Sequence, residues 1–336
     1  MKPKDTSIRP IQMTRRAAIL GAGALALSRP SYADDYPSRP IKIIVGFAAG
    51  GTSDSITRLY AQKMSEILKV GVVVENKPGG NQVNAINTLT SSPPDGYTLF
   101  TGGGSAIVQN PALRKDLAYN PLKDFSLIAL VATNPAVFFV NNDLPVKTLA
   151  EFVNYAKERP GKVNYGSAGV GTAGHLNIEV LMSLTGIKLV HVPYKADVDV
   201  IRETKNNNVQ MGMMPTLNAT NFIRAGDLRA IGVTTAKRLS YLPDAPGLVE
   251  TNIPGLTDLE PHTFAMFVGP AGMPAPLIAR LNEVFNSITR MPDVQSKLRD
   301  TYFAETVIMS PEEVRNFTTK EIEKWKRLGK DIVLPE

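Results

Sequence analysis

Two glycine-rich loops each lie between a predicted strand and a predicted helix, an arrangement that binds anions. Gly50 and Gly51 follow an apolar run at 41–47, and a second glycine-rich loop at 169–174 follows a predicted strand at 162–167. Glycines let the backbone approach an anion closely, and the free N–H groups of a helix N-terminus attract it. Thr52 and Ser53 add hydroxyl donors in the first loop. The chemistry predicted is capture of a small anion, such as a carboxylate, by neutral donors.

The second loop also matches a dinucleotide-binding pattern. Residues 169–174 read G-x-G-x-x-G, and Asp197 follows the next predicted strand. Such an acid after a glycine-rich strand–helix turn is typical of NAD-binding proteins. However, the motif lies mid-chain, and no His–Asp or Tyr–Lys pair is placed for hydride transfer. We therefore expect anion binding without a nucleotide, and no cofactor.

Other catalytic and metal-binding patterns are missing from the sequence. Tyr165 stands where a hydrolase nucleophile elbow around Ser167 needs glycine, and no convincing triad accompanies it. His175, His191 and His262 lack ligand spacing, and the chain has no cysteine. Asp54 is a first-turn acid that favours the helix dipole and would repel an anion, so it is not expected in the site. We predict no catalytic residue and no metal site.

The elements that must position the two loops form two α/β units. Strands are predicted at 41–47, 72–74 and 97–100 in the first unit, and at 162–167, 188–192 and 228–234 in the second, with helices between them. A further strand at 264–268 and helices at 277–289 and from residue 311 follow. Parallel sheets bind ligands outside the carboxyl ends of their strands. If the two units face each other, both helix N-termini point into one cleft.

The N-terminal segment carries most of the net charge of +6. Arg15 and Arg16 precede an uncharged apolar run at 17–27, and Ser31 and Ala33 provide small residues for cleavage. This layout predicts a signal peptide at 1–33, exported by either the general or the twin-arginine route. The segment holds six basic residues and one acidic residue, so the mature chain is close to +1. With no basic stripe interleaved with aromatics, we expect no nucleic-acid partner.

Many further pieces of the sequence follow one another in one order. They are Tyr36-Pro37, 47–58, 76–80, 94–99, 119–121 with 123–125, 165–169 with 171–172 and His175, 191–195, 225–229, 237–238 with 242–244, and 310–313 through Trp325. Together they resemble a known family, the Bug-type solute receptors of tripartite tricarboxylate transporters, over nearly all of the chain expected after the signal peptide.

The resemblance implies a two-lobed periplasmic-binding-protein-like (type II) α/β fold with crossing hinge strands and a ligand cleft between the lobes. It also implies a periplasmic receptor that passes a carboxylate, dicarboxylate or aromatic acid to the membrane permease of such a transporter. Lobe 1 is then expected at 34–138 and 256–336, and lobe 2 at 139–255. We expect a monomer, and the alternative is an exported hydrolase or nucleotide-dependent enzyme.

The ligand-binding residues implied lie mainly on the two glycine-rich loops, with neighbours after later strands. They are Phe47, Ala48, Gly51, Thr52, Ser53, Ser105, Ser167, Gly169, Thr172, Ala173, Pro215 and Thr216. The chain departs from the family where Lys195 runs into Ala196 and Asp197, and where 213–215 lacks an aspartate that the family often carries. The second departure argues against an amino group on the ligand, whose identity the sequence leaves open.

Overall fold

The structure is a computed structural model that describes residues 36–259, 263–330 and 332. Residues from Arg39 onward form one compact unit, and the following description concerns that unit. The expected signal peptide at 1–33 lies outside the described residues.

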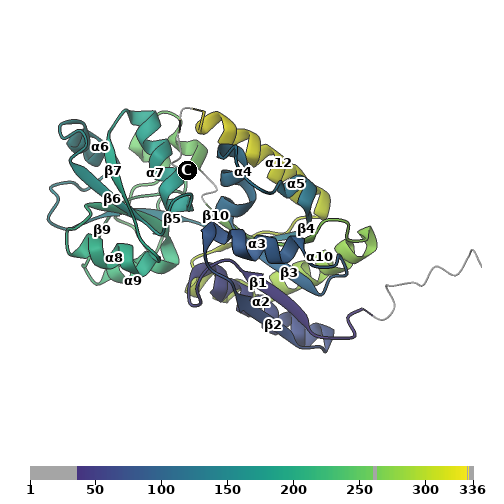
Figure 1. The fold of residues 1–336 in the computed structure, drawn as a ribbon. Helices are drawn as coiled ribbons and strands as arrows, with labels where there is room; N and C mark the ends of the chain where they lie inside the picture. The colour runs from purple at the N-terminus through teal and green to yellow at the C-terminus, as the bar shows by residue number, and fades with distance from the viewer. Residues whose placement is uncertain (1–35, 260–262, 331, 333–336) are drawn as a thin grey trace, which may run out of the picture. The chain divides into compact units, whose positions relative to one another are not determined.

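The first sheet has six strands in the order β11-β4-β10-β3-β1-β2 (Figure 1). Strand β1 pairs in parallel with β2 and β3, whereas β10 runs antiparallel to both β3 and β4. The bounds are β1 Ile41–Val45, β2 Val72–Asn76, β3 Thr98–Gly102, β4 Phe125–Asn134, β10 Thr263–Pro270 and β11 Glu305–Thr306. Because β1 and β3 are parallel neighbours, their carboxyl ends meet at one edge of the sheet.

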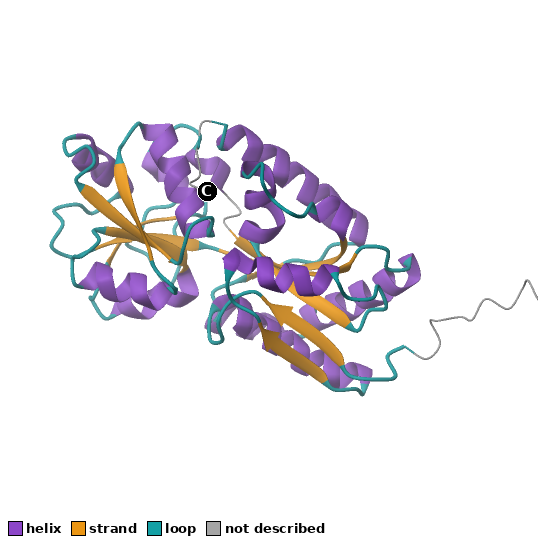
Figure 2. Ribbon diagram, viewed as in Figure 1, coloured by secondary structure: helices purple, strands orange, loops and turns teal. Residues whose placement is uncertain are grey.

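Helices cover both faces of this sheet (Figure 2). On one face, α2 (Thr52–Leu68) and α10 (Ala275–Thr289) pack against each other and against β10, where the rings of Tyr60, Phe285 and Phe267 make stacked and tilted contacts. On the other face, α3 (Val83–Thr90), α4 (Asn110–Leu113) and α12 (Pro311–Leu328) cover a core that includes the fully buried Trp325. The shorter elements are η1 Gly80–Gln82, η2 Ser105–Gln109, α5 Pro121–Asp124, α11 Pro292–Ser296 and η5 Lys297–Thr301.

The second sheet has five strands in the order β7-β6-β8-β5-β9. These are β5 Ala136–Val140, β6 Val163–Ser167, β7 Leu189–Pro193, β8 Met211–Pro215 and β9 Arg229–Val233. Alternate residues of β5 point to opposite faces. Phe138 faces a core shared with α6 (Leu149–Lys157) and α7 (Ala173–Thr185), and Phe139 faces a core shared with α8 (Asp197–Lys205) and α9 (Thr216–Arg224).

The chain passes between the sheets at two places. Strand β4 ends at Asn134 and β5 begins at Ala136 in the other sheet, so the first crossing lies at Pro135. The return occurs between Leu259 and β10, because the short helix η4 (Leu256–Leu259) still contacts α7, as well as η3 (Leu248–Thr251). Residues 136–138 pair within the second sheet, and residues 256–259 contact α7 and η3, which favours lobe limits other than those expected after residues 138 and 255. We propose lobe limits at Pro135 and just after Leu259.

Candidate functional site

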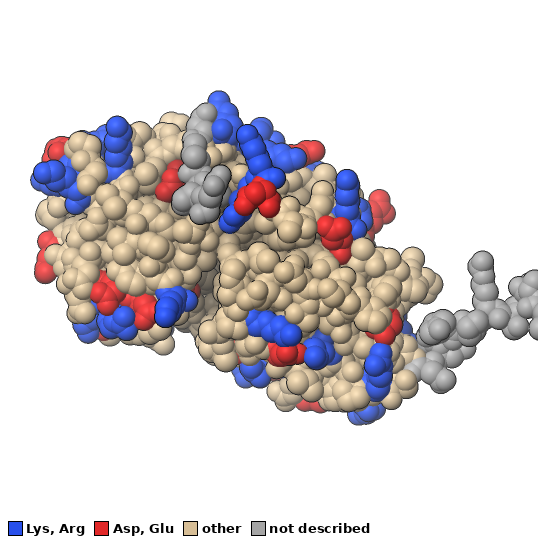
Figure 3. Space-filling view, in the orientation of Figure 1, with Lys and Arg blue, Asp and Glu red and all other residues tan. Residues whose placement is uncertain are grey.

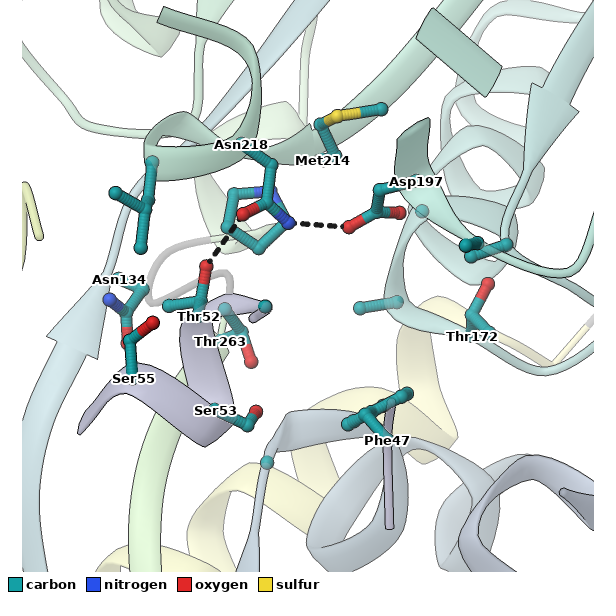
Figure 4. Close-up of a pocket in the computed structure, with 18 of the residues that line it drawn as sticks. Phe47, Thr52, Ser53, Ser55, Asn134, Thr172, Asp197, Met214, Asn218 and Thr263 are labelled. Carbon is teal, nitrogen blue, oxygen red and sulfur yellow. Dashed lines mark hydrogen bonds between the residues drawn. The ribbon is translucent and has the colours of Figure 1, made fainter. Parts of the chain in front are cut away.

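A cavity of about 540 Å³ lies where the two sheets face each other. This volume is in the range of small-molecule sites, about 300–1,000 Å³. Its walls come from both sheets, at the carboxyl ends of β1, β3, β6, β7 and β8 and along β10 (Figure 4). The first turns of four helices, α2, α7, α8 and α9, contribute residues to it. Helix N-termini carry unpaired N–H groups and a positive partial charge, so the cavity is suited to an anion.

The loop from β1 to α2 presents its backbone to this cavity. Gly50 has a φ of +91°, which favours glycine, and Gly51 is the N-cap and brings no side chain. Asp54 accepts hydrogen bonds from the Gly50 N–H, Arg58 Nε and Asn76 Nδ2, each at 2.9 Å. Burial alone would raise the pKa of Asp54, but these hydrogen bonds hold it below the ordinary value. The carboxylate is thus used within the fold, and the first-turn N–H groups after Gly51 remain open to the cavity.

The loop from β6 to α7 is built differently. Thr172 is the N-cap of α7, and both its N–H (3.3 Å) and its hydroxyl (2.7 Å) donate to the carbonyl of Gly169. The Thr172 donors therefore close the loop on itself. The next N–H groups, of Ala173 and Gly174, belong to the first turn of α7, where intrahelical acceptors do not exist. Both residues line the cavity, so these N–H groups are candidate donors from the second lobe.

A buried polar cluster supports this second loop from beneath. Ser167 Oγ lies 2.7 Å from His191 Nε2, and the Gly171 N–H donates to His175 Nδ1 at 3.1 Å. The two imidazole rings lie 4.1 Å apart. Burial lowers the pKa of His175 to about 3, with a further contribution from His191, and lowers that of His191 to about 4. Both rings are therefore neutral near pH 7.

Ser167 and His191 approach each other as a hydrolase dyad would, but their setting is structural. The Ser167 hydroxyl also donates to the Gly169 carbonyl at 3.0 Å, and the residue is only 1% exposed. Neither Ser167 nor His191 lines the cavity. The pair shapes the loop and is closed off from a bound molecule.

Asp197 and Asn218 lie on the first turns of α8 and α9, and both line the cavity. Asn218 Nδ2 donates to Asp197 Oδ2 at 2.6 Å, and Thr52 Oγ1 donates to Asn218 Oδ1 at 3.2 Å (Figure 4). The second bond joins α2 of one lobe to α9 of the other. Burial raises the pKa of Asp197, against the effect of the Asn218 hydrogen bond.

Nine of the twelve expected binding residues line the cavity. They are Phe47, Ala48, Gly51, Thr52, Ser53, Ser105, Thr172, Ala173 and Pro215. Ser167 and Gly169 lie under the loop, bonded to each other, and do not line it. Thr216 also points elsewhere: it is 1% exposed, its N–H donates to the Pro135 carbonyl and its hydroxyl bonds Tyr241 at 3.1 Å.

Sequence reasoning placed neither Asp197 nor Asn218 at the cavity. Both follow a strand of the second sheet and begin a helix, as the two glycine-rich loops do. The rule that ligands bind at the carboxyl ends of parallel strands applies equally to these positions and could have found them.

Within the described part of the chain, no group of three or more His, Cys, Asp or Glu side chains is placed to hold a metal ion. Among the described residues, no helix combines the length and apolar character needed to cross a membrane. On the face shown in Figure 3, acidic and basic side chains are interspersed. The site that remains is a cleft between two α/β lobes, whose lining is neutral apart from Lys195 and Asp197 among the described residues.

Such a cleft, bordered by two lobes that offer helix N-termini, is typical of solute-binding receptors. The chain belongs to the tripartite tricarboxylate transporter family receptors, whose sequence model matches residues 56–334. Because this family consists of solute receptors and not of enzymes, the chain is a receptor.

Individual relatives agree with this assignment. A UPF0065 protein of Bordetella pertussis is 33% identical over 285 residues, which cover 85% of this chain and 86% of that protein. The structure of R. palustris Rpa4515 with adipate is 28% identical with a TM-score of 0.80, covering 88% of this chain and 98% of the other. The structure of the periplasmic binding protein BugD is 29% identical with a TM-score of 0.78, at the same coverages. The expected Bug-type receptor and two-lobed α/β fold are confirmed.

Proposed function

We propose that this protein captures a small carboxylate between its lobes and delivers it to the membrane permease of a tripartite tricarboxylate transporter. The carrying observation is that first-turn N–H groups of α2 and α7, one from each lobe, border a single cavity. A carboxylate that accepts several charge-assisted hydrogen bonds needs no arginine partner. Closure of the lobes excludes water and strengthens each bond.

The relative solved with adipate supports a carboxylate as the ligand. The cavity is of a size for a dicarboxylate or an aromatic acid, and its lining is partly apolar through Phe47, Met213 and Met214. Two donor loops suit either two anionic groups or one group held by both lobes.

The remaining parts of the proposal concern where and how the receptor works. We propose export through the segment 1–33, cleavage near Ala33, and a monomeric periplasmic product that pairs with the permease subunits. N-terminal sequencing of the product from a periplasmic extract tests the cleavage, and light scattering tests the monomer.

A thermal-melting scan of the purified mature chain against mono-, di- and tricarboxylates and aromatic acids tests the central proposal. The expected result is saturable stabilisation by one or a few carboxylates without any turnover, followed by a calorimetric affinity. Neutral analogues, such as the corresponding amides, serve as controls. Stabilisation by nucleotides, or consumption of a compound during the assay, would show that the proposed function is wrong.

A further inference from the structure

Asp197 places a carboxyl group inside a cavity otherwise suited to an anion. Of the described residues that line the cavity, Lys195 and Asp197 are the charged ones. Lys195 is exposed, whereas Asp197 is partly covered on the first turn of α8. A carboxylate at this place repels a second carboxylate and attracts a hydrogen-bond donor.

The Asp197 side chain is held in a fixed orientation. An ionised carboxylate only accepts hydrogen bonds, so the Asn218 amide must turn its Nδ2 to Asp197 and its Oδ1 to the Thr52 hydroxyl. Asn218 thereby joins three elements, α2, α8 and α9. Within the described part of the chain, Asp197 Oδ1 has no protein donor and is free to accept from a bound molecule.

Asp197 is also within reach of a ligand held at the helix starts. Asn218 bonds both Thr52, at the N-terminus of α2, and Asp197, so one side chain spans the distance between the two. A small molecule with its carboxylate at the N-terminus of α2 therefore brings its next polar group close to Asp197. Burial of the Asp197 carboxyl raises its pKa, and a ligand donor would stabilise the ionised form as Asn218 does.

We propose that Asp197 is a specificity residue, which selects carboxylates that carry a hydrogen-bond donor, an ammonium or a hydroxyl group, on the part that faces α8. The inference rests on the proposed capture of a carboxylate and narrows its class. The lack of an aspartate at residues 213–215 argued against an amino group on the ligand. The proposal for Asp197 reverses that expectation, because this residue, which follows a different strand, can supply the carboxyl group that binds an amino group.

The experiment compares ligands matched in length that differ at one end. We would measure affinities for adipate, 6-hydroxyhexanoate and 6-aminohexanoate, for the corresponding glutarate and succinate sets, and for terephthalate, 4-hydroxybenzoate and 4-(aminomethyl)benzoate. The proteins are the wild type, Asp197→Asn and the control Asp199→Asn. Asp199 lies on the same helix and bonds Arg202 at 3.1 Å, away from the cavity, so its variant has the same charge change without the contact.

The wild type is expected to prefer the amino or hydroxy member of the set that fits. Asp197→Asn should weaken binding of the amino member by roughly 10- to 150-fold, as expected for loss of a hydrogen bond to a charged group, and should strengthen binding of the matched dicarboxylate. Asp199→Asn should leave both affinities within about twofold.

Equal shifts for all members of a set in Asp197→Asn, or no shift, would overturn the inference while leaving carboxylate capture intact. If none of these carboxylates binds the wild type, while a compound without a carboxylate does, both the inference and the proposed function fail. Circular dichroism of the Asp197→Asn variant establishes that a loss reflects binding and not unfolding.

Discussion

The N–H group of Thr52 is the sharpest test of recognition by helix starts. Thr52 is the first residue of α2, a position where proline is well tolerated because the N–H has no intrahelical acceptor. Gly51 before it has φ −79° and ψ 175°, the extended conformation that a following proline requires. Thr52→Pro therefore removes one N–H from the cavity wall and is expected to keep the helix.

The magnitude follows from the kind of bond that is lost. A hydrogen bond from an N–H to a charged carboxylate contributes about 1.5–3 kcal/mol, so Thr52→Pro should weaken carboxylate binding by roughly 10- to 150-fold. Thr52→Ala is the matched control, because it keeps the N–H and loses only the hydroxyl that bonds Asn218 at 3.2 Å. That neutral bond lies within the protein and contributes about 0.5–1.5 kcal/mol, so its loss should weaken carboxylate binding by at most roughly 2- to 12-fold.

Isothermal titration calorimetry of the wild type and both variants, with the carboxylate that stabilises the wild type most, measures the two effects. Thermal melting without ligand checks that each variant folds. If Thr52→Pro and Thr52→Ala bind with the same affinity, the Thr52 N–H does not hold the ligand, and the role assigned to the start of α2 is wrong.

The second lobe allows three further tests. Ala173→Pro should weaken carboxylate binding by roughly 10-fold or more in calorimetry, because it removes a first-turn N–H of α7. An unchanged affinity would show that this N–H of α7 does not bind the carboxylate and would leave α2 as the helix that does. Because the pKa values of His175 and His191 are lowered in the folded protein, the unfolded chain binds more protons than the folded one below about pH 6.5. The free energy of unfolding, measured in urea, should therefore fall between pH 6 and pH 5 by up to about 1.4 kcal/mol per pH unit for each histidine. The His191→Gln variant should show a smaller slope. A flat profile over this range would contradict the neutral, buried rings. Gly171→Ala should lower the melting temperature, because Gly171 has a φ of +76° and an added Cβ would lie 2.8 Å from Asn110 Oδ1; a melting temperature equal to that of wild type would show that the loop relaxes.

The regular strand–loop–helix units could be predicted from sequence because their signals are local. Both glycine-rich loops could be predicted because their glycines lie between an apolar run and a helix. In the structure, Thr52 and Ala173, which follow these loops, line the same cavity. The crossing strands β4 and β5 were not predicted as elements. Their continuous apolar sequence has no period, and only Pro135 separates them.

The contacts that span lobes could not be predicted, since they depend on how elements distant in sequence pack. Thr52 and Asn218 are 166 residues apart, and Asn218 and Asp197 are 21 apart. Ser167 does not line the cavity for a related reason. Its hydroxyl is as suitable a donor as that of Ser53, but the tight turn to Gly169 directs it inward to His191.

If backbone N–H groups at the helix N-termini bind the carboxylate, the fold provides the shared part of the binding site and the surrounding side chains determine its specificity. The N–H groups of α2 and α7 remain in place whatever side chains surround them, and in the proposed mode of binding they hold the carboxylate that all suitable ligands share. The other end of the ligand meets side chains such as Asp197, whose exchange alters charge without moving a strand. Because residues 34–336 are close to neutral, no long-range field from this part of the chain selects among anions, and the choice depends on these local contacts. A substitution at Asp197 should therefore change which carboxylate binds and leave the melting temperature of the empty receptor nearly unchanged.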